Sequence, residues 1–470
     1  MLILNILATI GTILAVLFLG LLVAAIMLLH SDLKGGILMK YANQISEIIN
    51  AFSPAPLRSE QMVEFYCEDT MEYRTSDKYN SPIEDIFDIC QNSEECSACL
   101  LLGHRGCGKS TELNRMSQKL VAEGYSVKII HCSTDLDLFN IVHSDLFILL
   151  GEALLEIAQE AGCEIENELL KNIQSFWEEG TEIRMAQETA SASIETGVSV
   201  ETKGILAGIL NLYTKIKADL KYNEEIRKEY RRKISIRSSE WIGILGKVAE
   251  EIAKKAEGKR PIVIFEDLDK LNPEDAWTVF YNYAAILSGM RFPVIYTFPI
   301  GLSYDTRFSA MESYFITKTL PMIKIETIDN QPFQEGIDII REIVKKRADL
   351  SLFETGVLEM LIQYTGGSLR DLFHVINTSA NRAKRRNSAV ISMEDAERAL
   401  EEVKTSLTRR IEEKDYDFLL KIYHENKERI ENKEMLLKML QASVVLEYNG
   451  KRWHNVHPLV MKFFKEQGMV

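Results

Sequence analysis

The sequence predicts an α/β fold built around a parallel sheet, and three observations support this prediction. Strand-like runs occur at Cys99–Leu102, Val127–Cys132 and Pro261–Phe265. Segments with a helical pattern separate these runs, and strands that alternate with helices are typical of parallel α/β sheets. A glycine-rich turn follows the first run and acidic residues follow the third, at the sheet edge where ligands bind in such folds. A chain of 470 residues has room for about two to four domains.

The composition is that of a globular protein with reduced cysteines. Hydrophobic residues make up 46% and charged residues 26% of the chain, which excludes a disordered protein, a collagen or a coiled-coil rod. The formal net charge of −14 argues against a protein that coats nucleic acid through its overall field, although a local basic patch stays open. Seven cysteines in this length are no disulfide framework, and their odd number favours reduced thiols inside a cell.

One segment departs from this average, because residues 2–29 contain no formally charged side chain. A helix needs about 20 apolar residues to cross a bilayer, so the segment predicts one transmembrane helix within residues 1–30. A cleaved signal peptide or a buried core helix is the alternative, but no basic residue precedes the segment. Lys34 and Lys40 follow it and predict a single-pass protein of the inner or plasma membrane, with residues 31–470 in the cytoplasm.

The most specific motif is the turn after the first strand, GHRGCGKST, which fits the pattern G-x-x-x-x-G-K-[ST]. Its glycines let successive backbone N–H groups face one phosphate, and the following helix adds the positive end of its dipole. Lys109 would bring a compensating charge to the β- and γ-phosphates, and Ser110 would offer its hydroxyl to Mg²⁺. A structural glycine turn is the alternative. The residues expected to bind nucleotide are Gly103, His104, Arg105, Gly106, Cys107, Gly108, Lys109, Ser110 and Thr111.

A second motif, the acidic pair at the end of the strand Pro261–Phe265, supplies the carboxylates that such a turn requires. Four apolar residues place this strand in a buried parallel sheet, so Glu266 and Asp267 emerge at its carboxyl end. One of them should hold Mg²⁺ through water, and the other should orient the attacking water. Aligned by the strand end, Glu266 holds the metal and Asp267 orients the water. The order is Glu then Asp, so exchanged roles stay open, and a solvated acidic turn is the alternative.

Two further residues lie where they could contact a γ-phosphate. Thr297 stands near the end of the apolar strand Phe292–Pro299, where it could reach the phosphate or only cap its own turn. Arg370 lies just inside a helix that two glycines open, and its charge could reach the phosphate if a lid domain folds over the site. The candidate catalytic residues are Lys109, Glu266, Asp267, Thr297 and Arg370.

The order of four segments, GHRGCGKST, IVIFEDLDKL, VIYTFP and TGGSLRDL, resembles the AAA+ and STAND branch of P-loop ATPases, which includes the replication initiators. The resemblance covers roughly residues 75–405. It implies a P-loop NTPase sheet of strand order 5-1-4-3-2 followed by a helical lid, with ATP and Mg²⁺ as ligands. It also implies that Thr297 is sensor 1 and that Arg370 is sensor 2.

The resemblance, together with the predicted transmembrane helix, predicts a membrane-anchored ATPase that hydrolyses ATP to drive a conformational or assembly switch. Two other functions stay open, namely a nucleotide-bound scaffold with little turnover and a membrane-tethered, DNA-associated ATPase. Arg307 is a candidate arginine finger that would act on a neighbouring subunit of a homo-oligomer. An exposed arginine with no such role is the alternative.

The chain divides into five predicted parts. These are a transmembrane helix at 1–30, a juxtamembrane linker and helical lead-in at 31–74, an ATPase core at 75–330, a helical lid at 331–405 and a winged-helix-like domain at 406–470. The last part shows two helical segments, a strand, an Asn449-Gly450 turn, a returning strand and a final helix. Residues 415–470 contain nine Lys or Arg and eight Asp or Glu, which gives a formal net charge of +1. A protein partner is therefore favoured over nucleic acid for this domain.

An insertion at about 135–255 lies within the predicted core. Phe147–Trp177 has a helical pattern, whereas Thr189–Lys203 alternates small polar and β-branched residues and predicts a hairpin or a flexible loop. Asn223–Arg237 is rich in basic residues and predicts a solvated helix face. A platform for a protein partner, an anionic lipid or nucleic acid is the alternative for that segment.

Two remaining patterns carry weaker hypotheses. Cys96 and Cys99, with Cys90 nearby, could hold zinc, but no second cysteine pair or matching histidine pair follows. Burial of Cys99 in the first strand is the favoured interpretation. The basic run Arg382–Arg386 predicts a solvated helix end, with phosphate contact as the alternative.

Overall fold

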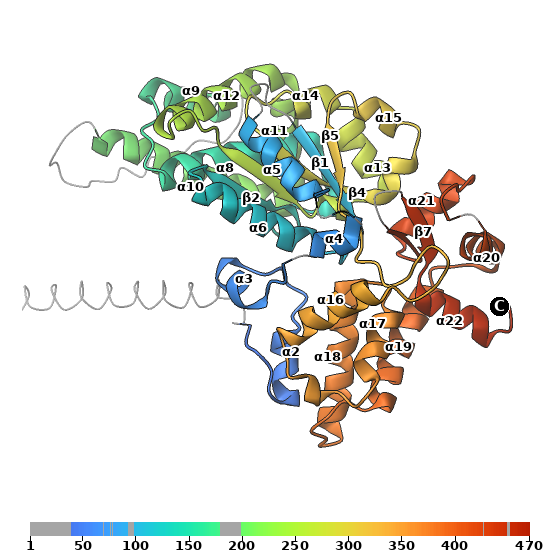
Figure 1. The fold of residues 1–470 in the computed structure, drawn as a ribbon. Helices are drawn as coiled ribbons and strands as arrows, with labels where there is room; N and C mark the ends of the chain where they lie inside the picture. The colour runs from blue at the N-terminus through green and yellow to red at the C-terminus, as the bar shows by residue number, and fades with distance from the viewer. Residues whose placement is uncertain are drawn as a thin grey trace, which may run out of the picture.

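The computed structural model describes residues 39–470 except 69, 76, 78, 93–97, 179–198, 426 and 449–451, and it describes only the backbone of residues 199–203. Figure 1 shows an α/β core, a helical lid at one end of it and a small C-terminal domain beside both. The core contains the central sheet and positions the candidate site at the boundary with the lid.

Five parallel strands form the central sheet, and the sequence locates the first four of them. The five strands are β1 (Ala98–Gly103), β2 (Val127–His131), β3 (Ile262–Glu266), β4 (Val294–Pro299) and β5 (Ile316–Thr319). Their order is β2-β3-β4-β1-β5, which confirms the order implied by the family resemblance, here read from the opposite edge. The turn after β1 and the acidic residues after β3 therefore emerge at the same edge of the sheet, where ligands bind in such folds.

Side chains of the sheet enter two hydrophobic clusters, because successive residues of a strand point to opposite faces. In β1, Leu100 faces the helices of the insertion, whereas Leu101 faces the opposite side. α5 (Pro82–Asn92) and α6 (Lys109–Ala122) cover that opposite side. The strands are apolar on both faces because both faces are buried.

The insertion between β2 and β3 forms a layer of helices on the face of the sheet to which Leu100 points. These helices are α7 (Cys132–Asp135), α8 (His143–Glu160), α9 (Asn167–Glu178), α10 (Ser199–Tyr222), α11 (Glu224–Ile236) and α12 (Ser238–Lys255). α8 and α9 confirm the helical prediction for this stretch. The hairpin or loop predicted for Thr189–Lys203 is wrong from Ser199 onward, where α10 begins, and residues 189–198 lie outside the described residues. The packed helix α10 overrides the weak strand preference of the alternating β-branched residues.

The charged helix α11 packs against the insertion along one side and exposes Lys228 and Arg232 on the other, so the predicted solvated face is found on only part of the helix. Arg231 forms an ion pair of 2.6 Å with Asp145 of α8, whose side chain is 1% exposed. Lys233 donates a hydrogen bond of 3.0 Å to the carbonyl of Trp177, and Arg227 is also buried. Long basic side chains bury their aliphatic stems easily, and a buried carboxylate requires a cation, so these charges face inward.

Short helices and turns connect the remaining strands of the core. Between β3 and β4 lie a 3₁₀ turn (Leu268–Lys270), α13 (Pro273–Ala276), a π-helical turn (Trp277–Tyr281) and α14 (Ala284–Ser288). Between β4 and β5 lie a 3₁₀ turn (Ile300–Tyr304) and α15 (Phe308–Met311). A further 3₁₀ turn spans Leu138–Asn140, before α8. The first of these turns holds the acidic residues that follow β3.

The lid contains α16 (Gln334–Lys345), α17 (Val357–Tyr364), α18 (Leu369–Arg385) and α19 (Met393–Thr408), with a 3₁₀ turn at Leu350–Leu352. The N-terminal segment forms a 3₁₀ turn (Ile45–Glu47), α2 (Ile48–Ala51), α3 (Ser59–Phe65) and α4 (Thr70–Thr75). Ala42, Ile48 and Phe52 belong to the hydrophobic cluster of the lid. Residues 42–52 of the predicted linker are therefore packed onto the lid, and α2 ends before Pro54, which cannot continue a helix.

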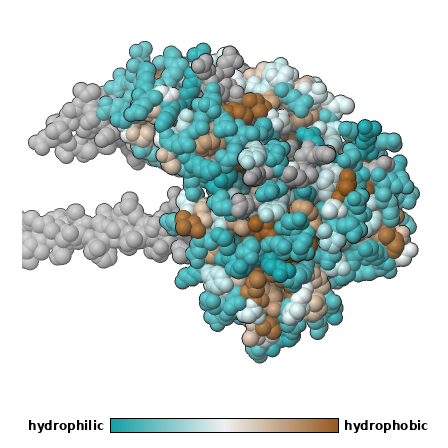
Figure 2. All heavy atoms as spheres, viewed as in Figure 1, coloured by the Kyte–Doolittle hydropathy of each residue, from teal (hydrophilic) through white to brown (hydrophobic). Residues whose placement is uncertain are grey.

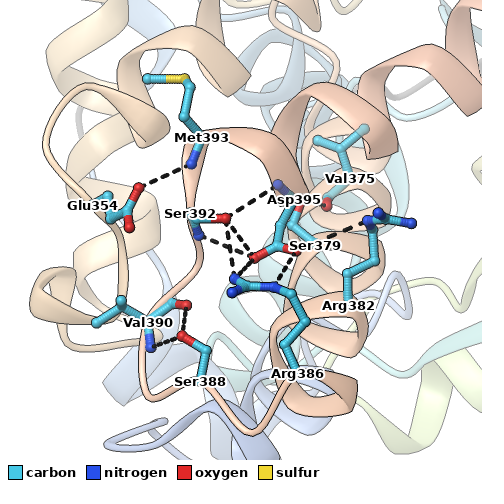
Figure 3. A network of polar contacts seen from close by, with 10 residues as sticks. All are labelled: Glu354, Val375, Ser379, Arg382, Arg386, Ser388, Val390, Ser392, Met393 and Asp395. Atoms are coloured by element: carbon cyan, nitrogen blue, oxygen red, sulfur yellow. Dashed lines mark hydrogen bonds and ion pairs between the residues drawn. The ribbon is translucent and has the colours of Figure 1, made fainter.

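A polar network ties α18 to α19 within the lid (Figure 3). Its centre is Asp395, which is 1% exposed and accepts hydrogen bonds from Ser392 and from Arg386. Arg382 approaches the same carboxylate at 3.9 Å. The basic run at the end of α18 is thus partly engaged with a buried carboxylate, which corrects the prediction of a fully solvated helix end.

The C-terminal domain has the predicted sequence of elements. It contains a 3₁₀ turn (Glu413–Asp415), α20 (Tyr416–His424), α21 (Lys433–Gln441), β6 (Val445–Tyr448), β7 (Trp453–Val456) and α22 (Pro458–Glu466), with β6 and β7 antiparallel. The predicted Asn449-Gly450 turn lies outside the described residues. Tyr448 of the hairpin donates a hydrogen bond of 2.8 Å to the carbonyl of Gly366 at the start of the lid's α18 segment. The hairpin therefore contacts the chain's own lid.

The predicted membrane localisation is corrected by the structure. Within the residues that the structure describes, no helix combines the length and the apolar character needed to cross a bilayer. The predicted span, residues 2–29, lies outside the described residues. Figure 2 shows that hydrophobic side chains on the face in view form separate patches on a mostly hydrophilic surface.

Candidate functional site

The turn between β1 and α6 has the backbone conformation of a phosphate-binding loop. Gly106 and Gly108 adopt φ angles of +87° and +102°, which residues with a Cβ atom rarely adopt. Gly108 is the N-cap of α6 and no side chain caps this helix end. The first N–H groups of α6 are therefore available to an anion, and the helix dipole favours negative charge at the same point.

Lys109 is buried beneath this loop, with 6% of its side chain exposed. Its ammonium group donates hydrogen bonds to the carbonyls of Gly103 at 2.8 Å and His104 at 3.0 Å. It also forms an ion pair of 2.9 Å with Asp269, whose side chain is 10% exposed. Burial alone would lower the pKa of Lys109, but the nearby Asp269 carboxylate raises it above its ordinary value. The lysine is therefore charged and already held at the acidic end of the β3 segment.

Glu266 ends β3 and is 2% exposed. Its Oε2 atom lies 3.1 Å from Nδ1 of His131, which ends the neighbouring strand β2. That hydrogen bond raises the pKa of His131 above its ordinary value, against the opposing effect of burial. The other oxygen, Oε1, is buried and has no hydrogen-bond partner among the described residues. A buried carboxylate oxygen without a partner is costly, so it points to a ligand that is bound during function.

Asp267 follows Glu266 in a left-handed conformation, with φ at +73°. Its carboxylate accepts hydrogen bonds from Ser133, which lies just beyond β2, and from Lys270 at 2.5 Å. Partial burial raises the pKa of Asp267, but the hydrogen bonds from Lys270 and Ser133 lower it below its ordinary value overall. The residue is thus ionised and fixed at the mouth of the site.

These groups line a cavity of about 760 Å³ between the core, the N-terminal segment and the lid. The predicted residues that line it are Gly106, Gly108, Lys109, Ser110, Thr111, Glu266, Asp267 and Arg370. The N-terminal segment contributes Pro54–Ser59, α16 contributes Ile343, the turn after α16 contributes Arg347, and α18 contributes Phe373. The structure therefore brings the loop, the acidic pair and the lid arginine together at one place.

Arg370 reaches this place because α18 begins beside the loop. A Cβ atom on Gly106 would lie only 2.6 Å from Cβ of Arg370, so the loop and the first turn of α18 are in close contact. Ser368 caps α18 by accepting a hydrogen bond from the N–H of Asp371. The lid helix is therefore anchored with its N-terminus against the phosphate-binding loop.

Among the predicted residues outside the loop, Thr297 and Arg307 do not line the cavity. The hydroxyl of Thr297 accepts a hydrogen bond of 3.1 Å from the N–H of Leu268 and donates one of 3.3 Å to the carbonyl of Phe265. It holds the backbone around the acidic pair. Arg307 forms an ion pair of 2.7 Å between its Nη2 atom and Oδ2 of Asp305, and its Cζ atom lies 4.4 Å from the ring centroid of Trp277. A role for Arg307 in a neighbouring subunit stays a prediction.

Three loop residues that the sequence assigns to nucleotide binding contact other parts of the protein, and their role in nucleotide binding stays a prediction. His104 is 1% exposed, and its Nε2 atom accepts a hydrogen bond of 2.8 Å from the N–H of Glu447 in β6. Burial lowers the pKa of His104 to about 3, so the imidazole is neutral. Cys107 is buried, and Arg105 donates to the carbonyl of Lys270 at 3.1 Å. The loop thus also contacts the C-terminal hairpin.

The structure gives no support to zinc binding within its described part. Cys90 and Cys99 are buried, and burial raises the pKa of Cys99 to about 12. Cys96 lies outside the described residues. No group of three or more His, Cys, Asp or Glu side chains in the described chain could hold a metal ion.

A magnesium ion would therefore depend on phosphate oxygens as well as on the protein. Ser110 and Glu266 both line the cavity, and the unpartnered Oε1 atom of Glu266 suits a hard cation that prefers oxygen ligands. Mg²⁺ commonly binds through one or two protein oxygens together with substrate phosphates. The residues present fit such an ion.

Sequence reasoning missed several residues of the site. His131 ends β2, and Ser133 and Asp269 follow the ends of β2 and β3, so the rule that strand ends meet at one edge could have found them. Arg74 and Arg347 carry no such signal, because each is a single arginine in an unremarkable segment far from the motifs. The sequence does not show that the N-terminal segment and α16 close the cavity.

Comparisons with known proteins give distant structural similarity only. No family model and no curated protein matches the chain. Among solved structures it is similar to Cdc6p from Pyrobaculum aerophilum, with 14% identity and a TM-score of 0.37 over 89% of this chain and 98% of that chain. The ORC2 protein of Aeropyrum pernix, in ADPNP and ADP complexes, has 13% identity and a TM-score of 0.35 over 89% and 98%. The RuvB Holliday junction branch migration motor of Thermotoga maritima has 10% identity and a TM-score of 0.33 over 86% and 99%. These low values leave the function to be argued from the residues of the site.

Proposed function

We propose that the chain binds ATP with Mg²⁺ in this cavity and hydrolyses it, as an ATPase of the AAA+ or STAND type. One observation carries the proposal. The phosphate-binding loop and the acidic end of β3 meet in one cavity, where Lys109 lies 2.9 Å from Asp269. A complete loop of this kind next to carboxylates at the end of a parallel strand suits a nucleoside triphosphate.

The loop would bind the phosphates of the nucleotide. The free N–H groups at the start of α6 face the cavity, and Lys109 would exchange its contact with Asp269 for contacts with the β- and γ-phosphates. Bound Mg²⁺, held by Ser110 and Glu266, would neutralise charge that develops on the phosphates. Arg370 at the N-terminus of α18 would add a positive charge from the lid.

Asp267 would orient the attacking water in this proposal. The hydrogen bonds from Ser133 and Lys270 keep its carboxylate ionised and fixed at the mouth of the cavity. An ionised carboxylate that is positioned by its neighbours can accept a proton or align a water molecule. Exchanged roles for Glu266 and Asp267 stay open, and their different environments make the two roles separable by mutation.

Two contacts support the use of ATP as a conformational or assembly switch. Arg370 of the lid packs against Gly106 of the loop, and Glu447 of the C-terminal hairpin donates to His104 of the same loop. A loop that changes its shape on binding phosphate would therefore alter its contacts with two other domains. Nucleotide binding can shift the population between two conformations of the chain only if these contacts differ between the two conformations.

A nucleotide-bound scaffold with little turnover is the second candidate. The observation that favours it is that Thr297 turns toward β3 and that Asp267 is engaged by two neighbours. A site of this kind could bind Mg-ATP tightly and still hydrolyse it slowly. Release of inorganic phosphate in single-turnover conditions separates the two candidates, because a scaffold retains intact ATP.

Titration calorimetry of the full chain with Mg-ATP tests the binding site. The wild type should bind one ATP, and Lys109→Ala should abolish binding. Lys119→Ala is the matched control, because Lys119 lies on the same helix, is 44% exposed and contacts Glu84 outside the cavity. Equal affinity of Lys109→Ala and wild type would contradict the proposed site.

A further inference from the structure

Arg74 is a buried arginine of the N-terminal segment that lies beside the phosphate-binding loop. It belongs to α4, which Figure 1 shows between the sheet and the lid. Its side chain is 2% exposed, and it donates a hydrogen bond of 2.7 Å to the carbonyl of Pro321. A Cβ atom on Gly108 would lie 3.4 Å from Nη2 of Arg74, so the guanidinium touches the point where α6 begins.

The charge of Arg74 has no counterpart in the described part of the protein. No carboxylate lies within ion-pair distance of it there, and its Nε atom is buried with no hydrogen-bond partner. Lys109, in the same cavity, pairs by contrast with Asp269, whereas the buried Arg347 also has no carboxylate partner among the described residues. Burying an uncompensated charge costs several kcal/mol, so this position favours an anionic ligand that completes it.

The cavity shows which anion fits. Arg74 lines the same cavity as Gly108, Lys109 and Ser110, on the side of the N-terminal segment. An arginine offers its donors in a planar fork, which matches two oxygens of one phosphate group. An anion at the start of α6 would meet the helix N-terminus from one side and the Arg74 fork from the other.

We propose that Arg74 binds a phosphate group of the nucleotide at Gly108. The inference rests on the proposed nucleotide site and adds to it a phosphate-binding residue that lies outside the loop. A bound phosphate would compensate the buried charge and thereby stabilise the N-terminal segment in the position that it has over the cavity.

Arg74→Gln in the full chain tests this contact. Affinities for ATP, ADP, AMP and adenosine are measured by displacement of a fluorescent ADP analogue. Hydrogen bonds to charged groups typically contribute about 1.5–3 kcal/mol, so ATP and ADP should bind about 10- to 100-fold more weakly. The affinity for adenosine, which has no phosphate, should fall by less than about threefold between the wild type and this variant, because the missing hydrogen bonds go to a phosphate. Arg74→Lys keeps the charge without the fork and should give an intermediate loss.

Arg227→Gln is the matched control, because Arg227 is also buried and also donates to a backbone carbonyl, that of Leu220 at 3.2 Å, outside the cavity. It should bind all four ligands as the wild type does. Unchanged ATP affinity in Arg74→Gln would overturn the inference, and so would an equal loss of adenosine affinity, which indicates a distorted cavity. A wild type that binds none of the four ligands contradicts the proposed function itself.

Discussion

The ammonium group of Lys109 lies 2.9 Å from the carboxylate of Asp269, and both side chains are nearly buried. The lysine expected to bind phosphates is therefore held by an internal anion that a nucleotide must replace. This contact keeps the charged lysine stable before a ligand arrives. It also means that Asp269 competes with the phosphates for the same cation.

Asp269→Asn should raise the affinity for nucleotide and lower the stability of the protein against unfolding when no nucleotide is bound. Removing one partner of a buried ion pair commonly costs about 3–5 kcal/mol, so the unfolding midpoint without ligand should fall. A phosphate should restore more stability in this variant than in the wild type, because it then supplies the missing charge. Thermal unfolding with and without ATP measures both effects. Asp85→Asn is the control: it removes an exposed partner of Lys318 and should change neither the unfolding midpoint nor its shift with ATP. If ATP stabilises Asp269→Asn less than it stabilises the wild type, Asp269 does not compete with the phosphates for Lys109.

Glu266→Gln and Asp267→Asn should affect different steps. A residue that holds Mg²⁺ contributes to nucleotide affinity, whereas one that orients water contributes mainly in the transition state. Glu266→Gln should weaken Mg²⁺-dependent ATP binding. Asp267→Asn should bind Mg-ATP nearly normally and hydrolyse it about 10²–10⁴-fold more slowly. Calorimetry and phosphate release measure the two steps. The reverse pattern exchanges the roles, and normal turnover in both variants shows that β3 carries no catalytic carboxylate.

Stability should fall as the pH decreases from about 6.5 to about 4, in part because of His143. Burial lowers the pKa of His143 from 6.5 to about 4, and its ring stacks on Tyr283 at 3.3 Å between centroids. Above pH 6.5 both states hold the imidazole neutral, and below it only the unfolded chain binds the proton, until the folded pKa is reached.

His143→Phe removes this single titration. The loss in the free energy of unfolding between pH 7.5 and 5.5 should be smaller in this variant by about 1 kcal/mol. Urea unfolding at both pH values gives the difference. An identical loss in both proteins would show that His143 titrates normally in the folded state.

His104→Ala should loosen the C-terminal hairpin. The N–H of Glu447 would lose its acceptor in a buried place, which costs about 1–3 kcal/mol. Amide hydrogen exchange in β6 should therefore accelerate in the variant without nucleotide, while exchange in β2 should stay unchanged. Unchanged protection of β6 would mean that the loop and the hairpin are not coupled through this bond.

The parts of the fold that could be predicted are those encoded by local patterns. Strands β1 to β4, the loop before α6 and the hairpin strands each have a short sequence signal, and the structure contains them, whereas the short strand β5 has no such signal. Thr297 shows the limit, because β4 is buried on both faces and its sequence does not indicate which way a polar side chain points. Asp269 could have been predicted, because it lies two residues after Asp267 and residues that follow the carboxyl ends of parallel strands meet at one edge of the sheet.

The remaining residues depend on contacts between distant segments. Arg74 contacts the backbone of Pro321, and Arg231 contacts Asp145, and neither partner can be identified from spacing alone. Basic residues of a charged helix look solvated in the sequence, although their stems and partners are buried in the fold. The membrane prediction rested on the apolar composition of one segment and on no contact at all.

Release of inorganic phosphate from Mg-ATP by the full chain tests the central claim most directly. The wild type should release phosphate at a rate that depends on Mg²⁺, Lys109→Ala should show no release above background, and Lys119→Ala should match the wild type. The contradicting result is equal phosphate release by Lys109→Ala and wild type, or none from either protein when the wild type is shown to be folded.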